Sequence, residues 1–102
     1  MTTGEIILLP FPFAELTNKK VRPAVVVCET ADKYRDLVVS AISSVVSDVP
    51  GENEIAIDPD LTNRLRTASV INVDRIVALK RQDVIAHIGK LDPDSLKLFK
   101  DK

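Results

Sequence analysis

Apolar residues along the chain gather in short runs separated by polar residues and prolines. The runs are rich in valine and isoleucine, which favour extended backbone, and several alternate apolar and polar positions with the period of a strand. Residues typical of turns bound them. The pattern predicts seven short strands, near 5–11, 22–29, 37–46, 53–57, 69–74, 75–81 and 85–91. Seven short strands in 102 residues indicate a mainly β fold, a barrel or a strongly bent sheet.

Two segments have helical features. The segment 58–68 contains DPDLTNRL and is predicted to make one short helical turn. After the last strand, Asp92 precedes Pro93, and Leu96 and Phe99 follow three positions apart. An aspartate at the N-cap, a proline at the first helical position and one apolar face predict a short C-terminal helix.

The chain shows no internal repeat, low-complexity segment or linker, so residues 1–102 are expected to form a single domain. The only cysteine, Cys28, can form neither an internal disulfide nor a cluster of thiolate ligands, which fits a reducing cytoplasm. The first apolar run has no basic segment before it and is interrupted by Pro10 and Pro12. We therefore expect neither a signal peptide nor a membrane span, and a cytoplasmic location.

Charge and composition restrict the chemistry. The chain carries 14 Lys and Arg against 15 Asp and Glu, a net charge of −1, so any nucleic-acid site has to be a local basic patch. Aromatic residues make up only 4%, which disfavours broad base stacking. His87 is the only histidine, which excludes a two-histidine ribonuclease mechanism. No histidine or cysteine spacing suits a metal, and both DPD sequences fit turns and caps, so we expect neither metal nor cofactor.

The most informative stretch runs from residue 4 to residue 29 and contains two apolar runs joined by a polar loop. Arg22 follows Lys19 and Lys20 in that loop and immediately precedes Pro23. Proline fixes its own φ and restricts the residue before it to extended backbone. The sequence therefore predicts a cation held at the entrance of a strand.

Five segments follow one another in the order GEIILLPFPF, KKVRPAVVV, LVVSAISSV, SVINVDRIVAL and IGKL. In this order they resemble the MazF/PemK toxins of type II toxin–antitoxin modules, over residues 4–91. The resemblance implies an SH3-like β-barrel, related to the CcdB fold, of about seven short strands with a short C-terminal helix. It also implies a homodimer that cleaves single-stranded RNA without metal, by attack of the ribose 2′-hydroxyl. A cognate antitoxin would bind through a flexible acidic segment.

Arg22 matches the catalytic arginine of that family. Its planar set of donors suits the phosphate oxygens on which charge accumulates in the transition state. A guanidinium is a poor proton donor, so we assign Arg22 mainly electrostatic stabilisation and leave an acid–base role open. The alternative is a surface arginine that neutralises a carboxylate.

Ser43 stands where the family carries a threonine or serine, and it is the second catalytic candidate. Its hydroxyl can donate to phosphate, whereas Ser44, on the opposite face of a regular strand, is a candidate for contact with RNA. The alternative is that both serines satisfy backbone groups at a strand end.

Asn72 and Asp74 lie two residues apart and share a face if their strand is regular. Some family members carry an arginine in the site at the position of Asn72, so this chain keeps Arg22 as its one strong candidate for stabilising transition-state charge. Asn72 could instead read a base edge. Asp74 could act as general base or orient Arg22, and the alternative is an ordinary pair between Asp74 and Arg75.

Weaker candidates complete the predicted site. Glu5 is a possible catalytic or orienting group, although tying the strand start to its neighbours is the more ordinary role. Lys19 and Lys20 are candidates for contact with RNA phosphates, or are simply solvated. His87 is interpreted as an ordinary strand residue.

Two other functions stay open at this stage. The same barrel could bind a protein, as a poison of DNA gyrase does, or the chain could be an inactive homologue that only binds antitoxin. The sequence identifies neither the RNA motif nor the antitoxin.

Overall fold

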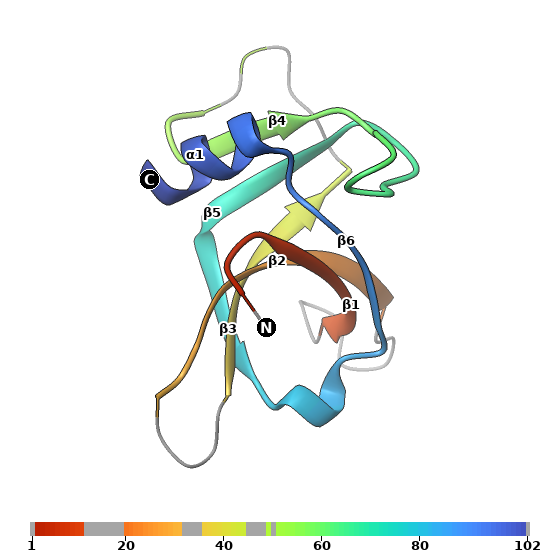
Figure 1. The fold of residues 1–102 in the computed structure, drawn as a ribbon, viewed down its shortest axis with the longest axis vertical. Helices are drawn as coiled ribbons and strands as arrows, with labels where there is room; N and C mark the ends of the chain where they lie inside the picture. The colour runs from red at the N-terminus through yellow and green to blue at the C-terminus, as the bar shows by residue number, and fades with distance from the viewer. Residues whose placement is uncertain (1, 12–19, 32–35, 45–48, 50, 102) are drawn as a thin grey trace.

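The computed structural model describes residues 2–11, 20–31, 36–44, 49 and 51–101 of the chain (Figure 1). Six strands, one 3-10 helix and one α-helix lie in these residues. In chain order they are β1 (Glu5–Phe11), β2 (Lys20–Glu29), β3 (Leu37–Ser43), β4 (Glu54–Ile57), β5 (Ser69–Leu79), η1 (Arg81–Asp83), β6 (Ala86–Lys90) and α1 (Pro93–Asp101).

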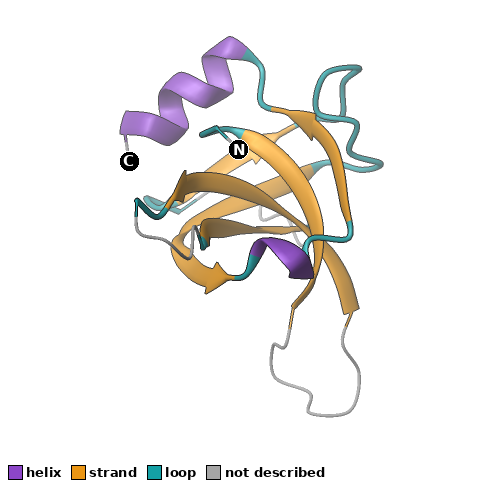
Figure 2. Ribbon diagram, turned by 60° about the horizontal axis from the view of Figure 1, so that its bottom comes forward, coloured by secondary structure: helices purple, strands orange, loops and turns teal. Residues whose placement is uncertain are grey.

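All six strands belong to one antiparallel sheet in the order β4-β5-β3-β2-β1-β6. The sheet curls into a half-barrel (Figure 2), and α1 lies outside it beside β4 (Figure 1). The predicted mainly β, barrel-like fold with a C-terminal helix is confirmed. The predicted number of strands is wrong, because the described residues form six strands and not seven.

The miscounted strand lies in β5. Residues 69–74 and 75–81 were expected to be separate strands, but one strand runs from Ser69 to Leu79. Its pairing with β3 jumps, since Ser40 faces Ile76 while the next residue, Ala41, faces Asn72. Unpaired residues of this kind bend a strand without ending it, and β5 bends sharply in Figure 1. The Ser40 hydroxyl donates to the Val73 carbonyl at 3.2 Å, which ties the bend to β3.

Other boundaries differ less. β2 begins at Lys20, two residues earlier than expected, so Arg22 lies inside the strand and not at its entrance. β3 ends at Ser43, short of the predicted residue 46. In the segment 58–68 the Arg64 N–H donates to the Asp60 carbonyl at 3.0 Å, which closes one helical turn as expected, although no helix continues from it.

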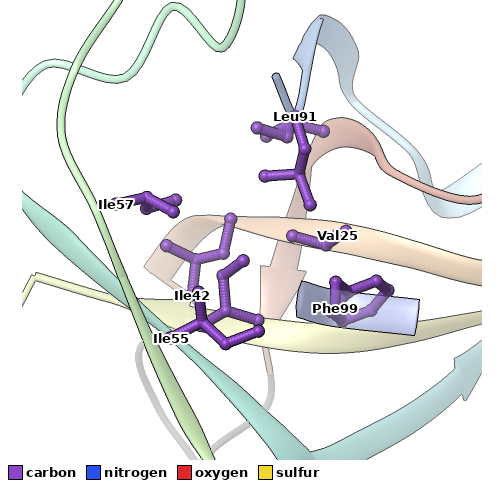
Figure 3. Close-up of a cluster of buried hydrophobic side chains, with 8 residues drawn as sticks. Val25, Ile42, Ile55, Ile57, Leu91 and Phe99 are labelled. Carbon is purple, nitrogen blue, oxygen red and sulfur yellow. The ribbon is translucent and has the colours of Figure 1, made fainter. Parts of the chain in front are cut away.

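Two apolar clusters fill the two faces of the sheet, because neighbouring residues of a strand point to opposite sides. One cluster joins the strands to α1 and contains Ile6, Val25, Ile42, Ile55, Ile57, Ile71, Leu91 and Phe99 (Figure 3). The other contains Ile7, Leu9, Ala24, Val26, Leu37, Val39 and Ala41. Both faces of β1, β2 and β3 are therefore buried, which fixes the position of these strands.

The C-terminal helix is confirmed with the expected cap. The Ser95 N–H donates to the Asp92 carboxylate at 3.3 Å, and Phe99 is buried in the core. Hydrogen bonds from Ser95 hold the pKa of Asp92 below its usual value, although partial desolvation opposes this shift. No helix in the described residues is long and apolar enough to span a bilayer.

Candidate functional site

An open cavity of about 730 Å³ contains Arg22. We call it the Arg22 pocket. Its lining comes from β1, β2, the end of β3, the loop between β4 and β5, the start of β5, and β6. The lining residues are Leu8, Val21, Arg22, Pro23, Ile42, Ser44, Arg64, Leu65, Arg66, Thr67, Ser69, His87 and Ile88. Segments distant in the sequence thus meet at Arg22.

One side of the pocket, which we call the strand wall, consists of Val21–Pro23 of β2 together with Ile42 and Ser44. Within β2, Arg22 pairs with Leu9 and Pro23 pairs with Leu8 of β1. The register between β2 and β3 starts only at Ala24. Proline has no N–H for the sheet ladder. Because the pairing of β2 with β3 starts only after Pro23, β3 does not pair with Arg22, which lines the pocket.

Residues 64–67 also line the pocket, and they belong to the loop of residues 58–67 between β4 and β5, which we call the loop wall. Asn63 organises it, with only 1% of its surface exposed. The Asn63 side-chain oxygen accepts the N–H groups of Asp60 at 3.1 Å and Leu65 at 2.9 Å. Its amide nitrogen donates to the Asp58 carbonyl at 2.8 Å. One buried side chain thus replaces the backbone pairing that a loop lacks.

Asp60 completes the turn from the other end. Its carboxylate accepts the N–H groups of Thr62 at 2.8 Å and Asn63 at 2.6 Å. The next residue, Arg64, has a left-handed backbone with φ of 56°. This conformation costs a residue with a Cβ on the order of 1 kcal/mol, so the hydrogen bonds around Asn63 are what hold Arg64 there.

The loop wall rests against β6 at Gly89. The Lys90 N–H donates to the Thr62 carbonyl at 3.1 Å. A Cβ on Gly89 would lie 2.3 Å from the Thr62 carbonyl oxygen and 2.7 Å from that of Asn63. Only glycine permits this close approach. Because β6 pairs with β1 and β1 with β2, the sheet fixes the loop wall relative to Arg22.

The charged side chains among the described lining residues of the pocket are those of arginines. Arg22 belongs to the strand wall, and Arg64 and Arg66 belong to the loop wall. Among the described residues that line the pocket, none carries a carboxylate. Within the described part of the chain none of these three arginines forms an ion pair, unlike Arg81, which pairs with Glu29 at 3.1 Å. The pocket therefore favours an anion.

His87 also lines the pocket, and it is paired with Glu5. Its Nε2 lies 2.9 Å from a Glu5 carboxylate oxygen. The other Glu5 oxygen accepts the N–H of Thr2. The carboxylate fixes the orientation of the imidazole, a side chain of the type used in general acid–base catalysis. Glu5 thus lies where an orienting role is possible, and it ties the strand start to its neighbours.

The structure brings some predicted site residues together and separates others. Ser44, which follows β3, lines the pocket together with Arg22, and so does Ile42 of β3. Ser43 is not among the lining residues. Ser43 pairs with Val70 across the ladder to β5. Which of the two hydroxyls serves the site stays a prediction.

The remaining predicted residues lie elsewhere. Asn72 pairs with Ala41 and Glu54, and it does not line the pocket. Asp74 is exposed on the bend of β5, also outside the pocket. Lys19 lies outside the described residues, and so does the side chain of Lys20. Their proposed roles stay predictions.

Sequence reasoning missed Arg64 and Arg66 and gave His87 no role in the site. An R-x-R pair in a polar loop after DPD resembles an ordinary solvated turn, so no local signal identified it. The usable signals were Asn63, a residue suited to a structured turn, and Gly89, one of only three glycines. No set of three His, Cys, Asp or Glu side chains that could hold a metal is found in the described residues.

Comparison with known families gives one match. The family model for a PemK-like, MazF-like toxin of type II toxin–antitoxin systems matches residues 2–102. No curated protein matches the chain. The matched range includes both walls of the Arg22 pocket.

Proposed function

Because the chain belongs to the PemK-like, MazF-like toxins of type II toxin–antitoxin systems, we propose that it is an endoribonuclease that cleaves single-stranded RNA in the Arg22 pocket without a metal. One observation carries this proposal. Arg22 lies without an ion pair, among the described residues, in a cavity whose described lining holds further cations and no carboxylate. A phosphodiester supplies the negative charge that this cavity lacks.

The proposed reaction uses a nucleophile that the RNA itself carries. The ribose 2′-hydroxyl attacks the adjacent phosphorus, the bond from phosphorus to the 5′ oxygen breaks, and a 2′,3′-cyclic phosphate and a 5′-hydroxyl result. The Arg22 guanidinium donates to the phosphate oxygens, which gain charge in the transition state. A serine hydroxyl from the end of β3 donates to the same phosphate.

The reaction also needs a proton removed from the 2′ oxygen and a proton delivered to the 5′ oxygen. Of the described residues that line the pocket, His87 carries an imidazole, the side chain that most often serves as general acid or base in catalysis. Glu5 holds it in place at 2.9 Å. The pair of His87 and Glu5 thus supports a reaction in which these residues transfer the proton and Arg22 stabilises the negative charge of the transition state.

The family implies an antitoxin partner. We propose that a flexible acidic segment of the antitoxin occupies the Arg22 pocket, because its carboxylates can form charge-assisted hydrogen bonds with the same guanidinium groups that bind phosphate. RNA and antitoxin would then compete for one site.

We also propose that the toxin acts as a cytoplasmic homodimer. β4 is an edge strand of the sheet, and Leu98 of the adjacent α1 is 52% exposed. An edge strand beside an exposed apolar side chain is a surface on which a second copy can pair. Sedimentation velocity tests this, and a monomer at micromolar concentration would contradict it.

The decisive experiment incubates purified protein with single-stranded RNA in excess EDTA and identifies the product ends. We expect 2′,3′-cyclic phosphate ends, and a loss on the order of 10²–10³ in kcat for Arg22→Ala, as removal of one transition-state donor produces. Arg75→Ala, an exposed arginine outside the pocket, is the matched control and should keep full activity. Intact RNA with the wild-type protein, or unchanged cleavage in Arg22→Ala, would refute the proposal.

A further inference from the structure

We propose that the loop wall is a preformed phosphate-binding arm, in which Arg64 and Arg66 bind the RNA phosphates that flank the one held at Arg22. This inference rests on the proposed function, and it names the residues that hold the substrate strand. Some family members carry a second arginine of the site at the position of Asn72. In this chain, Arg64 and Arg66 of the loop would supply that additional positive charge.

The first argument is electrostatic. Three guanidinium groups in one cavity repel one another, and no described lining residue offsets them with a carboxylate. An arrangement of this kind is stabilised when a polyanion enters. The cavity volume of about 730 Å³ exceeds what a single phosphate needs, and the arginines come from two separate segments of the chain. A strand with repeated phosphates can use all three, whereas a lone anion cannot.

The second argument concerns how the arm presents its charges. Leu65 stands between the two arginines and packs against the apolar cluster that contains Phe99. With Leu65 anchored on the core, its neighbours Arg64 and Arg66 are both exposed. Arg64 and Arg66 therefore line the pocket on either side of a residue that is anchored on the core.

The third argument is preorganisation. Asn63 is buried and makes three hydrogen bonds to the backbone of the loop. Gly89 admits the loop backbone to within contact of β6. The loop therefore already has a defined shape without RNA, and binding does not have to order it, which lowers the entropic cost of the complex. A left-handed arginine, held at φ of 56° by this network, fits a residue placed for recognition.

Phosphate suits the arm better than the base edges do. Arginine binds phosphate oxygens through two parallel donors, and such contacts position a strand whatever its sequence. The arm is thus expected to add affinity and salt dependence with little sequence preference, while the strand wall acts on the scissile phosphate.

The experiment measures binding separately from cleavage. The probe is an RNA that the wild-type protein cuts, with a single 2′-deoxy nucleotide at the mapped cleavage site so that no attack can occur. Fluorescence anisotropy gives Kd at a series of salt concentrations for the wild type, Arg64→Ala, Arg66→Ala, the double variant and the control Arg75→Ala. Each lost phosphate contact should reduce the slope of log K against log salt by about 0.7.

We expect Arg64→Ala and Arg66→Ala each to weaken binding about tenfold and to reduce the slope, the double variant to reduce it by about twice as much, and Arg75→Ala to match the wild type. Unchanged slopes in a protein that still cleaves RNA would overturn the arm and leave the proposed function intact. No binding or cleavage by the wild type would overturn both. If the variants lose affinity only for an acidic peptide, the arm docks protein and the proposal is wrong.

Discussion

The two walls of the Arg22 pocket hold their arginines by different means. In the strand wall Arg22 sits in β2, whose backbone pairs with β1 and whose neighbouring residues Ala24 and Val25 are fully buried. In the loop wall no ladder exists, and one buried amide, one carboxylate and one glycine perform the same task. Position in the strand wall follows from the whole sheet, whereas position in the loop wall depends on a few side chains. The loop wall should therefore be the easier one to displace by a single substitution.

The first prediction concerns Asn63→Ala, which removes the three hydrogen bonds of the Asn63 side chain in a buried position. Groups of Asp58, Asp60 and Leu65 then lack partners, and we expect a loss of about 3 kcal/mol in the free energy of unfolding, measured by urea denaturation. If the fold survives at low temperature, KM for RNA should rise while kcat stays within about twofold, because Arg22 remains in place.

A double-mutant cycle distinguishes positioning from general damage. In the Asn63→Ala background, Arg66→Ala should cost much less affinity than in the wild type, since the arm is already displaced. Equal costs in the two backgrounds would show that Asn63 serves only stability. Gly89→Ala is a second route to the same displacement, because its Cβ would push the Thr62 carbonyl away, and it should share the KM effect.

The second prediction concerns the strand wall and its two serines. Ser44 lines the pocket and Ser43 does not, so removing the Ser44 hydroxyl should reduce kcat/KM about tenfold, the cost of one hydrogen bond to a charged group. Ser43→Ala should reduce kcat/KM less than Ser44→Ala does if contact with the pocket determines which serine acts. Single-turnover cleavage by the two variants measures this. A larger loss in Ser43→Ala would instead support the family pattern and place the reacting phosphate on the other face of β3.

The fold was largely predictable from the sequence, because valine and isoleucine runs with the period of a strand leave few alternatives to a sheet. The exception is the predicted break between Asp74 and Arg75, which separated the strands 69–74 and 75–81. One strand, β5, continues through both residues, since a strand can bend at residues that face solvent. Local polarity could not distinguish a bend from an end, and only the pairing with β3 decides it.

The candidate site was predictable only in part. Arg22 was singled out because Pro23 restricts its backbone and because its surroundings resemble a known family. Arg64 and Arg66 were not identified, because their role depends on Asn63 and on a contact with Gly89, which lies 26 positions after Asn63 in the sequence. Contacts between distant segments leave no periodic signal, so a loop that folds onto a strand looks like any polar turn.

The third prediction uses a residue that belongs to neither wall as the reference for them. Asp92 caps α1, and its folded-state pKa is lowered chiefly by a hydrogen bond from the Ser95 side chain, with a smaller contribution from the Ser95 N–H. A carboxylate with a depressed pKa stabilises the fold above its unfolded value of 3.8, and this contribution disappears as the pH falls through the lower folded value. Asp92→Ala should therefore lose about 1 kcal/mol at pH 7, and the difference from the wild type should shrink toward zero in strong acid. Asp92→Asn keeps a good cap without a titrating group, so it should retain most of the stability at pH 7 without this acid dependence. Urea denaturation across the pH range measures the effect, and a difference that does not change with pH would contradict the assignment.

The same variant is a control for RNA binding. At pH 7 Asp92→Ala should bind the 2′-deoxy probe as the wild type does. Equal weakening in Asp92→Ala and Asn63→Ala would mean that lost stability alone, and not a displaced loop wall, accounts for both.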